Sequence, residues 1–253
     1  MTDITATTAA PGASDDLVSA FQIEGLPVRG RVVRLGAAVD EVLTRHDYPE
    51  PVANLLGEAC ALAALVGSSL KFEGRLIVQA QGDGPVRYFV VDYDTDGGLR
   101  GYCRFDPEEV AKASEGFVRP GARTLLGGGT FMMTVDQGPD MDRYQGITSI
   151  EGETLDAWTH VQALFETTGE DELIDPTVPS TLLLWRLFNE DGVRLLEEKP
   201  LRAFCRCSQE RISGMLGSFK AEEIADMVEP DGKIHVTCEY CSREYALEPA
   251  AVG

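Results

Sequence analysis

Four of the six cysteines lie close together near the C-terminal end of the 253-residue chain, as Cys205-Arg-Cys207 and Cys238-Glu-Tyr-Cys241. Two close pairs of thiols separated by a loop are a common ligand set for a closed, tetrahedral zinc site. The first pair is a C-x-C, and its Cα atoms lie about 6.6 Å apart in an extended chain. That separation is near the upper limit for a disulfide, so a bond between Cys205 and Cys207 is strained. The spacing therefore predicts a metal clip and leaves a redox switch open.

A catalytic thiol pair is the third interpretation of these residues. In thioredoxin-like enzymes the C-x-x-C pair stands at the start of a helix. Cys238 and Cys241 instead stand between two expected strands of a small hairpin, Lys233–Thr237 and Arg243–Leu247. We therefore favour zinc ligation, with one ion per reduced chain, over redox catalysis. The spacing alone leaves open whether the zinc is only structural or is also part of a switch.

The other cysteines and the histidines do not predict a second site. Cys60 lies in an apolar helix and Cys103 in a strand, where we expect small, buried core residues. His235 lies on the opposite face of its strand from Ile234 and Val236, and four cysteines already complete a tetrahedral shell. The chain contains no G-x-S-x-G, H-E-x-x-H or P-loop motif. We therefore predict that it is not an enzyme.

The charge balance argues against polyanionic partners. The chain has 42 acidic and 22 basic residues and a formal net charge of −20. Such a field repels nucleic acids and anionic membrane surfaces, so we expect neither as a partner. The most apolar stretch, Ala59 to Gly67, is too short to span a bilayer. Residues 1–15 lack Lys and Arg and predict a disordered tail rather than an export signal, which places the six cysteines in the reducing cytoplasm.

The order of expected strands and helices predicts an α+β protein in three parts after this tail. Residues 16–155 are predicted to form an N-terminal mixed α/β domain with an antiparallel sheet. Residues 156–200 are predicted to be a helical linker, and residues 201–253 a small zinc-binding domain. In the first domain we expect two helices, Ala37–His46 and Val52–Lys71, and strands at Val28–Leu35, Gly74–Gln81, Val86–Tyr93, Leu99–Phe105 and Thr130–Asp136.

Helical spacing and a capping residue predict the remaining elements. Apolar residues recur at helical spacing within 158–165 and within 182–187, which predicts helices in the linker. Ser208 is expected to cap a helix at the start of the zinc-binding domain. A second short helix is expected over Ala221–Val228.

Short motifs along most of the chain, from about Leu17 to Ala246, point to a known family. In the first domain they are His46-Asp-Tyr-Pro49, Leu70-Lys-Phe-Glu-Gly74, Gln81-Gly-Asp-Gly-Pro85, Arg100-Gly101 and Tyr144-Gln-Gly146. Further along the chain they are Leu184-Trp-Arg-Leu187 and Cys205-Arg-Cys-Ser-Gln-Glu-Arg211. In combination, these motifs resemble the bacterial redox-regulated holdase chaperones of the thirty-three-kilodalton heat-shock protein family.

The resemblance implies a complete functional cycle. By it, Cys205, Cys207, Cys238 and Cys241 hold zinc in a reduced, inactive monomer. Oxidants then release the metal and form the disulfides Cys205–Cys207 and Cys238–Cys241. The zinc-binding domain and the linker unfold, the protein dimerises, and it captures unfolding client proteins without ATP, protecting against oxidative and heat stress. A static zinc module and an oxidoreductase are the competing classes.

One segment departs from the family pattern. After Glu151-Gly-Glu-Thr-Leu155 the family continues through a further helix-and-strand segment, whereas this chain passes almost directly to Trp158-Thr-His-Val-Gln162. We therefore expect a family segment to be missing near residues 155–157.

Overall fold

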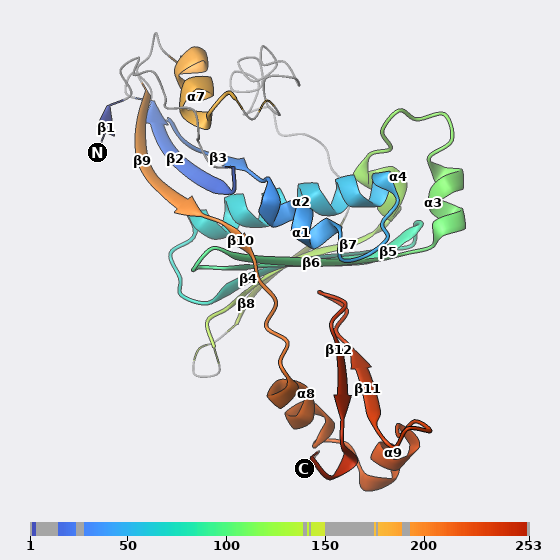
Figure 1. The fold of residues 1–253 in the computed structure, drawn as a ribbon. Helices are drawn as coiled ribbons and strands as arrows, with labels where there is room; N and C mark the ends of the chain where they lie inside the picture. Colours follow the sequence, from blue (N-terminus) through green and yellow to red (C-terminus); the bar gives the residue numbers. More distant parts are fainter. Residues whose placement is uncertain are drawn as a thin grey trace.

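A six-stranded sheet dominates the part of the chain that the computed structural model describes, which comprises residues 2–3, 15–23, 28–138, 141, 143–149, 175, 177–188 and 193–251. Its strands lie in the order β10 (Arg202–Ala203), β6 (Gly98–Phe105), β5 (Val86–Asp94), β4 (Arg75–Gly82), β7 (Gly129–Asp136) and β8 (Tyr144–Ser149). All neighbours pair antiparallel except β10, which adds parallel to the edge strand β6. Figure 1 shows this sheet beneath the helices α1 and α2. The predicted α+β fold with an antiparallel sheet is confirmed.

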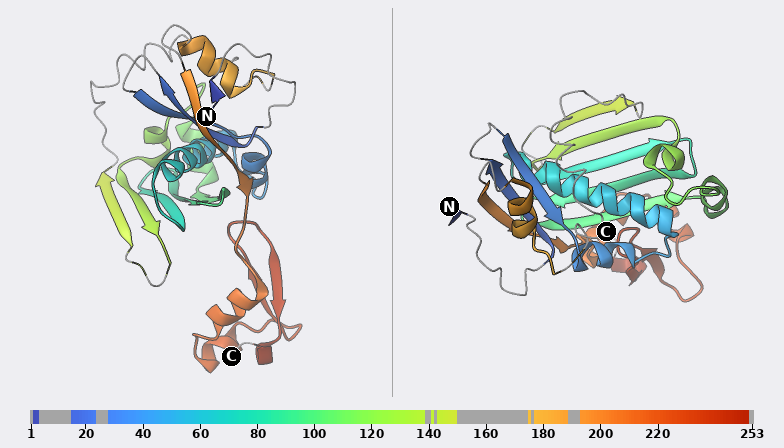
Figure 2. Two further views of the ribbon diagram at one scale, coloured as in Figure 1. Left: turned by 90° about the vertical axis from the view of Figure 1, so that its left-hand side faces the viewer. Right: turned by 90° about the horizontal axis from the view of Figure 1, so that it is seen from above.

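Helix α2 (Glu50–Ser69) forms the centre of the core. Pro49 is its N-cap residue, and the helix packs across one face of the six-stranded sheet, as the view from above in Figure 2 shows. Gly67 allows the closest approach, because a Cβ atom there would lie 2.2 Å from the Tyr93 ring. Among the described residues, α2 alone is long and apolar enough by composition to cross a membrane. The apolar stretch is thus longer than Ala59–Gly67 predicted, but its packing against the sheet identifies a core helix.

A second sheet has four strands in the order β1 (Thr2–Asp3), β9 (Val193–Pro200), β2 (Leu17–Ile23) and β3 (Val28–Arg34). Strand β9 corrects the expectation of a wholly helical linker over 156–200, because it pairs antiparallel with β2 along its length. Strand β1 likewise falls within the predicted tail, most of which lies outside the described residues. Helix α7 (Ser180–Phe188) confirms the expected second linker helix, whereas the helix expected within 158–165 lies outside the described residues.

Three short helices complete the first domain. They are α1 (Ala37–Leu43), α3 (Pro107–Ala113) and α4 (Ala122–Leu126). Helix α1 was predicted, but α3 and α4 were not. The sequence does contain a start signal for α3, because Asp106 is a good N-cap residue and Pro107 follows it at the first helical position. In the structure the Asp106 side chain accepts hydrogen bonds from the backbone N–H groups of Glu108 and Glu109.

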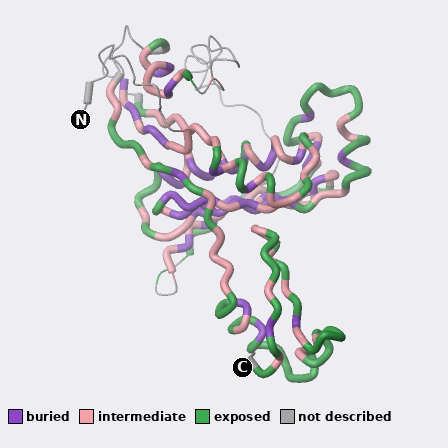
Figure 3. Tube along the Cα trace, in the orientation of Figure 1, coloured by how far each residue is buried: buried purple, intermediate pink, exposed green. Residues whose placement is uncertain are grey.

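The C-terminal module is small and weakly buried. It contains α8 (Gln209–Leu216), α9 (Ala221–Asp226), the hairpin β11 (Ile234–Thr237) and β12 (Glu244–Leu247), and a closing 3-10 turn, Pro249–Ala251. Ser208 caps α8 by accepting the backbone N–H of Arg211, as predicted. The module's buried apolar core consists of four residues, Ile212, Leu216, Ile234 and Leu247. Figure 3 shows how few buried residues the module has beside the first domain.

Candidate metal centre

The four C-terminal cysteines converge at one point. Their sulfur atoms all lie within 4.8 Å of one another. The sulfurs are 3.5 Å apart for Cys205 and Cys207, 3.7 Å for Cys205 and Cys238, and 3.3 Å for Cys207 and Cys241. All four side chains are partly buried thiols. The structure therefore brings together the four residues whose spacing indicated a common site.

The geometry fits a tetrahedral metal ion. Four sulfurs at about 2.3 Å from a central zinc ion lie about 3.8 Å from one another. The observed separations between neighbouring sulfurs are close to that value. A donor set of thiols alone favours zinc and other thiophilic ions over calcium or magnesium. The cluster could therefore hold a metal ion once its thiols have lost their protons.

The first pair enters the cluster directly from a strand. The N–H of Phe204 donates to the carbonyl of Leu99 at 2.8 Å, which keeps β10 and its continuation against β6. Cys205 follows at once, and its sulfur lies 3.5 Å from the sulfur of Cys207. The first two sulfurs are thus placed by a segment that belongs to the sheet of the first domain.

The second pair lies in the turn between β11 and β12. The N–H of Cys238 donates to the carbonyl of Arg243 at 2.9 Å, and the N–H of Ser242 donates to the carbonyl of Cys238 at 2.8 Å. Ser242 has a φ of 53°, in the left-handed region that residues other than glycine rarely occupy. This tight turn directs the sulfurs of both Cys238 and Cys241 into the cluster. The pair stands at the end of a strand and not at the start of a helix, where a thioredoxin-type pair would lie.

Tyr245 is a neighbour of the cluster that the sequence interpretation missed. Its hydroxyl donates a hydrogen bond of 3.1 Å to the Cys207 sulfur. Burial opposes ionisation of Cys207, but hydrogen bonds from Tyr245 and the neighbouring thiols outweigh it and lower the Cys207 pKa to about 7. Burial raises the pKa of Cys241 to about 12. Alternation along β12 could have identified Tyr245, because it shares a face with the buried Leu247.

The other candidate residues lie apart from this cluster. Cys60 and Cys103 are buried in the first domain, as predicted, and burial raises the pKa of each thiol to about 12. His235 is exposed and hydrogen-bonds Asp231 at 2.8 Å, which raises the pKa of the imidazole. None of these three side chains is among the clustered ligand atoms.

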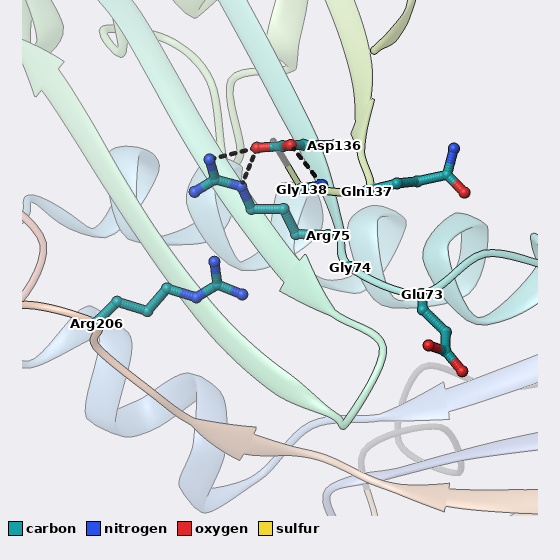
Figure 4. Close-up of a pocket in the computed structure, with 7 residues that line it drawn as sticks. All are labelled: Glu73, Gly74, Arg75, Asp136, Gln137, Gly138 and Arg206. Carbon is teal, nitrogen blue, oxygen red and sulfur yellow. Dashed lines mark hydrogen bonds and ion pairs between the residues drawn. The ribbon is translucent and has the colours of Figure 1, made fainter. Parts of the chain in front are cut away.

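A polar pocket of about 290 Å³ lies where the module meets the first domain. It is lined by Glu73, Gly74, Arg75, Asp136, Gln137, Gly138 and Arg206. Figure 4 shows Arg75 directed at Asp136, while Arg206 reaches in from the segment that carries the first cysteine pair. Arg75 donates to Asp136 from Nε at 3.0 Å and from Nη2 at 2.6 Å. The pocket is therefore a charged junction between the two parts of the chain.

Comparisons with known proteins agree with these features. The model of the family described as "Hsp33 protein" matches residues 16–160 and 153–248. The chain is 69% identical to a protein named 33 kDa chaperonin from Caulobacter vibrioides, covering 98% of this chain and 99% of that protein. A 33 kDa chaperonin from Pseudomonas fluorescens is 31% identical over 94% of this chain and 92% of its own length. The Caulobacter alignment extends over 302 positions, more than the 253 residues of this chain, so the relative contains residues that have no counterpart here.

A solved structure shares the fold. The crystal structure of a 33 kDa chaperonin from Thermotoga maritima matches with a TM-score of 0.78, although only 17% of the residues are identical. The match covers 94% of this chain and 97% of that protein. At this level of identity the comparison establishes the architecture of sheet domain and C-terminal module.

The fold and the thiol cluster define a sheet domain that carries a small module with four clustered thiols, which could hold a metal ion. The chain belongs to the Hsp33 family, because the family model matches most of its length and a relative of high identity spans nearly all of it. This is a family of chaperones, which is not a class of enzymes. A chaperone binds unfolded client proteins, and the four clustered cysteines are compatible with zinc binding and with redox behaviour.

Proposed function

We propose that this chain is a redox-regulated, ATP-independent holdase in the bacterial cytoplasm. In this proposal it binds unfolding proteins after oxidation of its cysteines and protects them during oxidative and heat stress. The observation that carries the proposal is the cluster of four sulfurs within 4.8 Å, placed where the module joins the first domain. A chemical change at this cluster therefore acts on a module that has only a small apolar core of its own.

In the proposed reduced state, Cys205, Cys207, Cys238 and Cys241 hold one zinc ion and the protein is an inactive monomer. A bound zinc ion supplies a structural cross-link that contributes about 10–16 kcal/mol to small modules of this kind. The apolar core of the module has only four buried residues, so its own packing is weak. The module therefore relies on its thiolates for a fixed structure.

In the proposed oxidised state, the thiols form the disulfides Cys205–Cys207 and Cys238–Cys241. For each disulfide, two zinc-bound thiolates give up two electrons as the S–S bond forms, and one molecule of hydrogen peroxide takes these electrons and two protons from solvent to give two molecules of water. The distances between sulfurs do not select this pairing, because Cys207 lies as close to Cys241 as to Cys205. The pairing rests on the family resemblance and on the short separation of each pair along the chain.

Loss of the thiolates then unfolds the module and the linker. In the proposed cycle the opened protein dimerises and binds clients through newly exposed apolar segments, such as α7 with its buried Leu183 and Leu184. The net charge of −20 keeps the opened state soluble and argues against nucleic acid or a membrane as the partner.

The experiment that tests this proposal compares one preparation before and after peroxide treatment. Zinc release and thiol loss are measured together with suppression of the aggregation of a heat-denatured client enzyme. We expect one zinc ion to be released per chain and aggregation to be suppressed only after oxidation. Equal suppression by reduced, zinc-loaded protein would contradict the redox regulation, and insulin reduction by the chain would favour an oxidoreductase.

A further inference from the structure

The residue between the first two cysteines bonds to the first domain. Arg206 pairs with Asp94 at the end of β5, donating from Nε at 3.1 Å and also from Nη2. Asp94 is only 6% exposed. Burial raises its pKa even with Arg206 beside it, so without the guanidinium a charged carboxylate is costly at this position. Arg206 therefore attaches the first cysteine pair to the end of a central strand.

A residue between the last two cysteines makes a second contact with the sheet. The Tyr240 ring lies 4.1 Å from the guanidinium carbon of Arg100, in cation–π geometry. Asp92 on the neighbouring strand β5 holds Arg100 in place. Arg100 donates to this buried carboxylate from Nε at 2.8 Å and from Nη2 at 2.5 Å. The Arg100 guanidinium that Tyr240 contacts is thus held in position by groups of the sheet itself.

The residue after the last cysteine makes a third contact. The Ser242 hydroxyl donates to the carbonyl of Arg45 at 2.7 Å, beyond the end of α1. The left-handed conformation of Ser242 belongs to the same turn that directs the sulfurs of Cys238 and Cys241 into the cluster. The contact and the ligand geometry therefore share one backbone conformation.

The placement of the Arg206 side chain follows from the spacing of the first cysteine pair. In an extended segment, residues at i and i+2 point to one side and the residue between them points to the other. Cys205 and Cys207 both direct their sulfurs into the cluster, so Arg206 is directed away from it and toward the sheet. Tyr240 and Ser242 lie on either side of Cys241 in the turn between β11 and β12, and that turn directs both side chains at the first domain.

We propose that Arg206, Tyr240 and Ser242 form a latch that holds the module against the six-stranded sheet only while the four sulfurs remain clustered. The latch deepens the proposed redox regulation by naming the contacts through which the state of the cysteines controls docking. A disulfide would draw the Cys205 and Cys207 sulfurs from 3.5 Å to about 2 Å and separate them from the other pair. The two segments that carry the cysteine pairs then no longer hold the three side chains in one arrangement. The face of the sheet around Arg100 and Asp94 is uncovered.

The test is made on the full chain in the reduced, zinc-loaded state. The double variant Arg206→Ala/Tyr240→Ala removes two of the three latch side chains but no cysteine. We expect wild-type zinc content and a docking equilibrium weakened by roughly tenfold for each side chain removed. Amide nitrogen relaxation measures this, because the module of the variant should tumble independently whereas the wild-type module tumbles with the sheet. In wild-type protein stripped of zinc under reducing conditions, the relaxation of the module should likewise no longer follow that of the sheet.

Two further variants keep the test decisive. Asp94→Asn weakens the ion pair with Arg206 by a change in the sheet and leaves the sequence of the module intact. This variant therefore tests the latch even if the double variant loses zinc. Lys233→Ala is the matched control, since Lys233 carries a positive charge of the module but pairs with Glu248 inside it. Continued joint tumbling of the module and the sheet in both latch variants would overturn the proposal, as would docking that survives zinc removal. These readouts need no client or oxidant, so they stand or fall separately from the chaperone assay.

Discussion

The Arg34 guanidinium on β3 donates a 2.7 Å hydrogen bond to the main-chain carbonyl of Asp175, a residue 141 positions further along the chain. The same guanidinium donates to the carbonyl of Val178 and pairs with Asp15 at 3.1 Å. Asp175 and Val178 lie just before the start of α7 in the sequence. Helix α7 itself contacts β9. Arg34 therefore fixes the start of the linker helix to the second sheet.

Replacing Arg34 should loosen α7 without disturbing the metal centre. Hydrogen bonds from a charged donor contribute about 1.5–3 kcal/mol each, so Arg34→Ala should accelerate amide exchange in α7 by at least about tenfold. Hydrogen exchange with mass spectrometry of the reduced protein measures this. Arg29→Ala on the same strand is the control, since Arg29 is exposed. Unchanged protection of α7 in Arg34→Ala would show that β9 alone holds the helix.

Removing two of the four thiols should abolish metal binding. The variant Cys238→Ser/Cys241→Ser leaves two sulfurs, which cannot complete a closed tetrahedral site. Elemental analysis should find one zinc ion per reduced wild-type chain and less than a tenth of that in the variant, on the order expected from the loss of two ligands. Full zinc occupancy of the variant would show that other residues bind the metal.

The two cysteines of the first domain should be dispensable for switching. Cys60 and Cys103 are buried, and each thiol has a pKa raised to about 12, so neither is a reactive thiolate at neutral pH. Cys60→Ala should lower the free energy of unfolding by about 1–2 kcal/mol, because it leaves a small cavity against α2. Peroxide-dependent activation should remain, measured by client aggregation. Loss of activation in a folded Cys60→Ala protein would place this thiol in the switch.

Acid should weaken the sheet through Asp136. Hydrogen bonds from Arg75 hold the pKa of this buried carboxyl below its usual value of 3.8. A lowered pKa contributes stability that is fully present above that value and is lost as the pH falls through the lower, folded-state pKa. Asp136→Asn should therefore cost about 1–3 kcal/mol near neutral pH and flatten the loss of stability below about pH 4. Urea unfolding of the first domain at several pH values measures both effects, with the exposed Asp47→Asn as control.

The sequence predicted elements that have local sequence signals, but few of the contacts between segments that are distant in the sequence. Strands β4 to β7 and the hairpin β11–β12 were predicted because alternation and glycine turns are local signals. Strand β9 was not, because Val193–Pro200 has no clear alternation and its partner β2 lies far away in the sequence. Pairing with a distant strand decided its structure.

The candidate site shows the same division. The cysteine spacing predicted which four thiols meet, because each pair is a local motif. The contacts of Arg206 and Tyr240 with the sheet were not predicted, since each joins residues more than a hundred positions apart. Figure 1 shows α7 at the far side of the first domain from the module, so the two do not border one another.

The last prediction concerns the path from the cysteines to the linker. Because α7 lies away from the module, a signal must pass along the chain through β10 and then β9. The N–H of Leu201 donates to the carbonyl of Asp16 at 2.7 Å, and this bond joins the two strands to the second sheet. Oxidation should free the module first, then detach β10 from β6, and then fray β9 from its Pro200 end.

Hydrogen exchange on reduced and oxidised protein can follow this order. We expect rapid exchange over residues 205–251, a smaller loss of protection at Leu201 and Phe204, and a gradient along β9 that reaches α7. Strands β4 to β7 should keep their protection, because the core around α2 does not include the module. The variant Arg34→Ala should enlarge the change in α7 and leave the change in the module as it is. If β9 and α7 kept full protection while zinc was released and clients were bound, the first domain alone would capture clients and the linker would have no part in the switch.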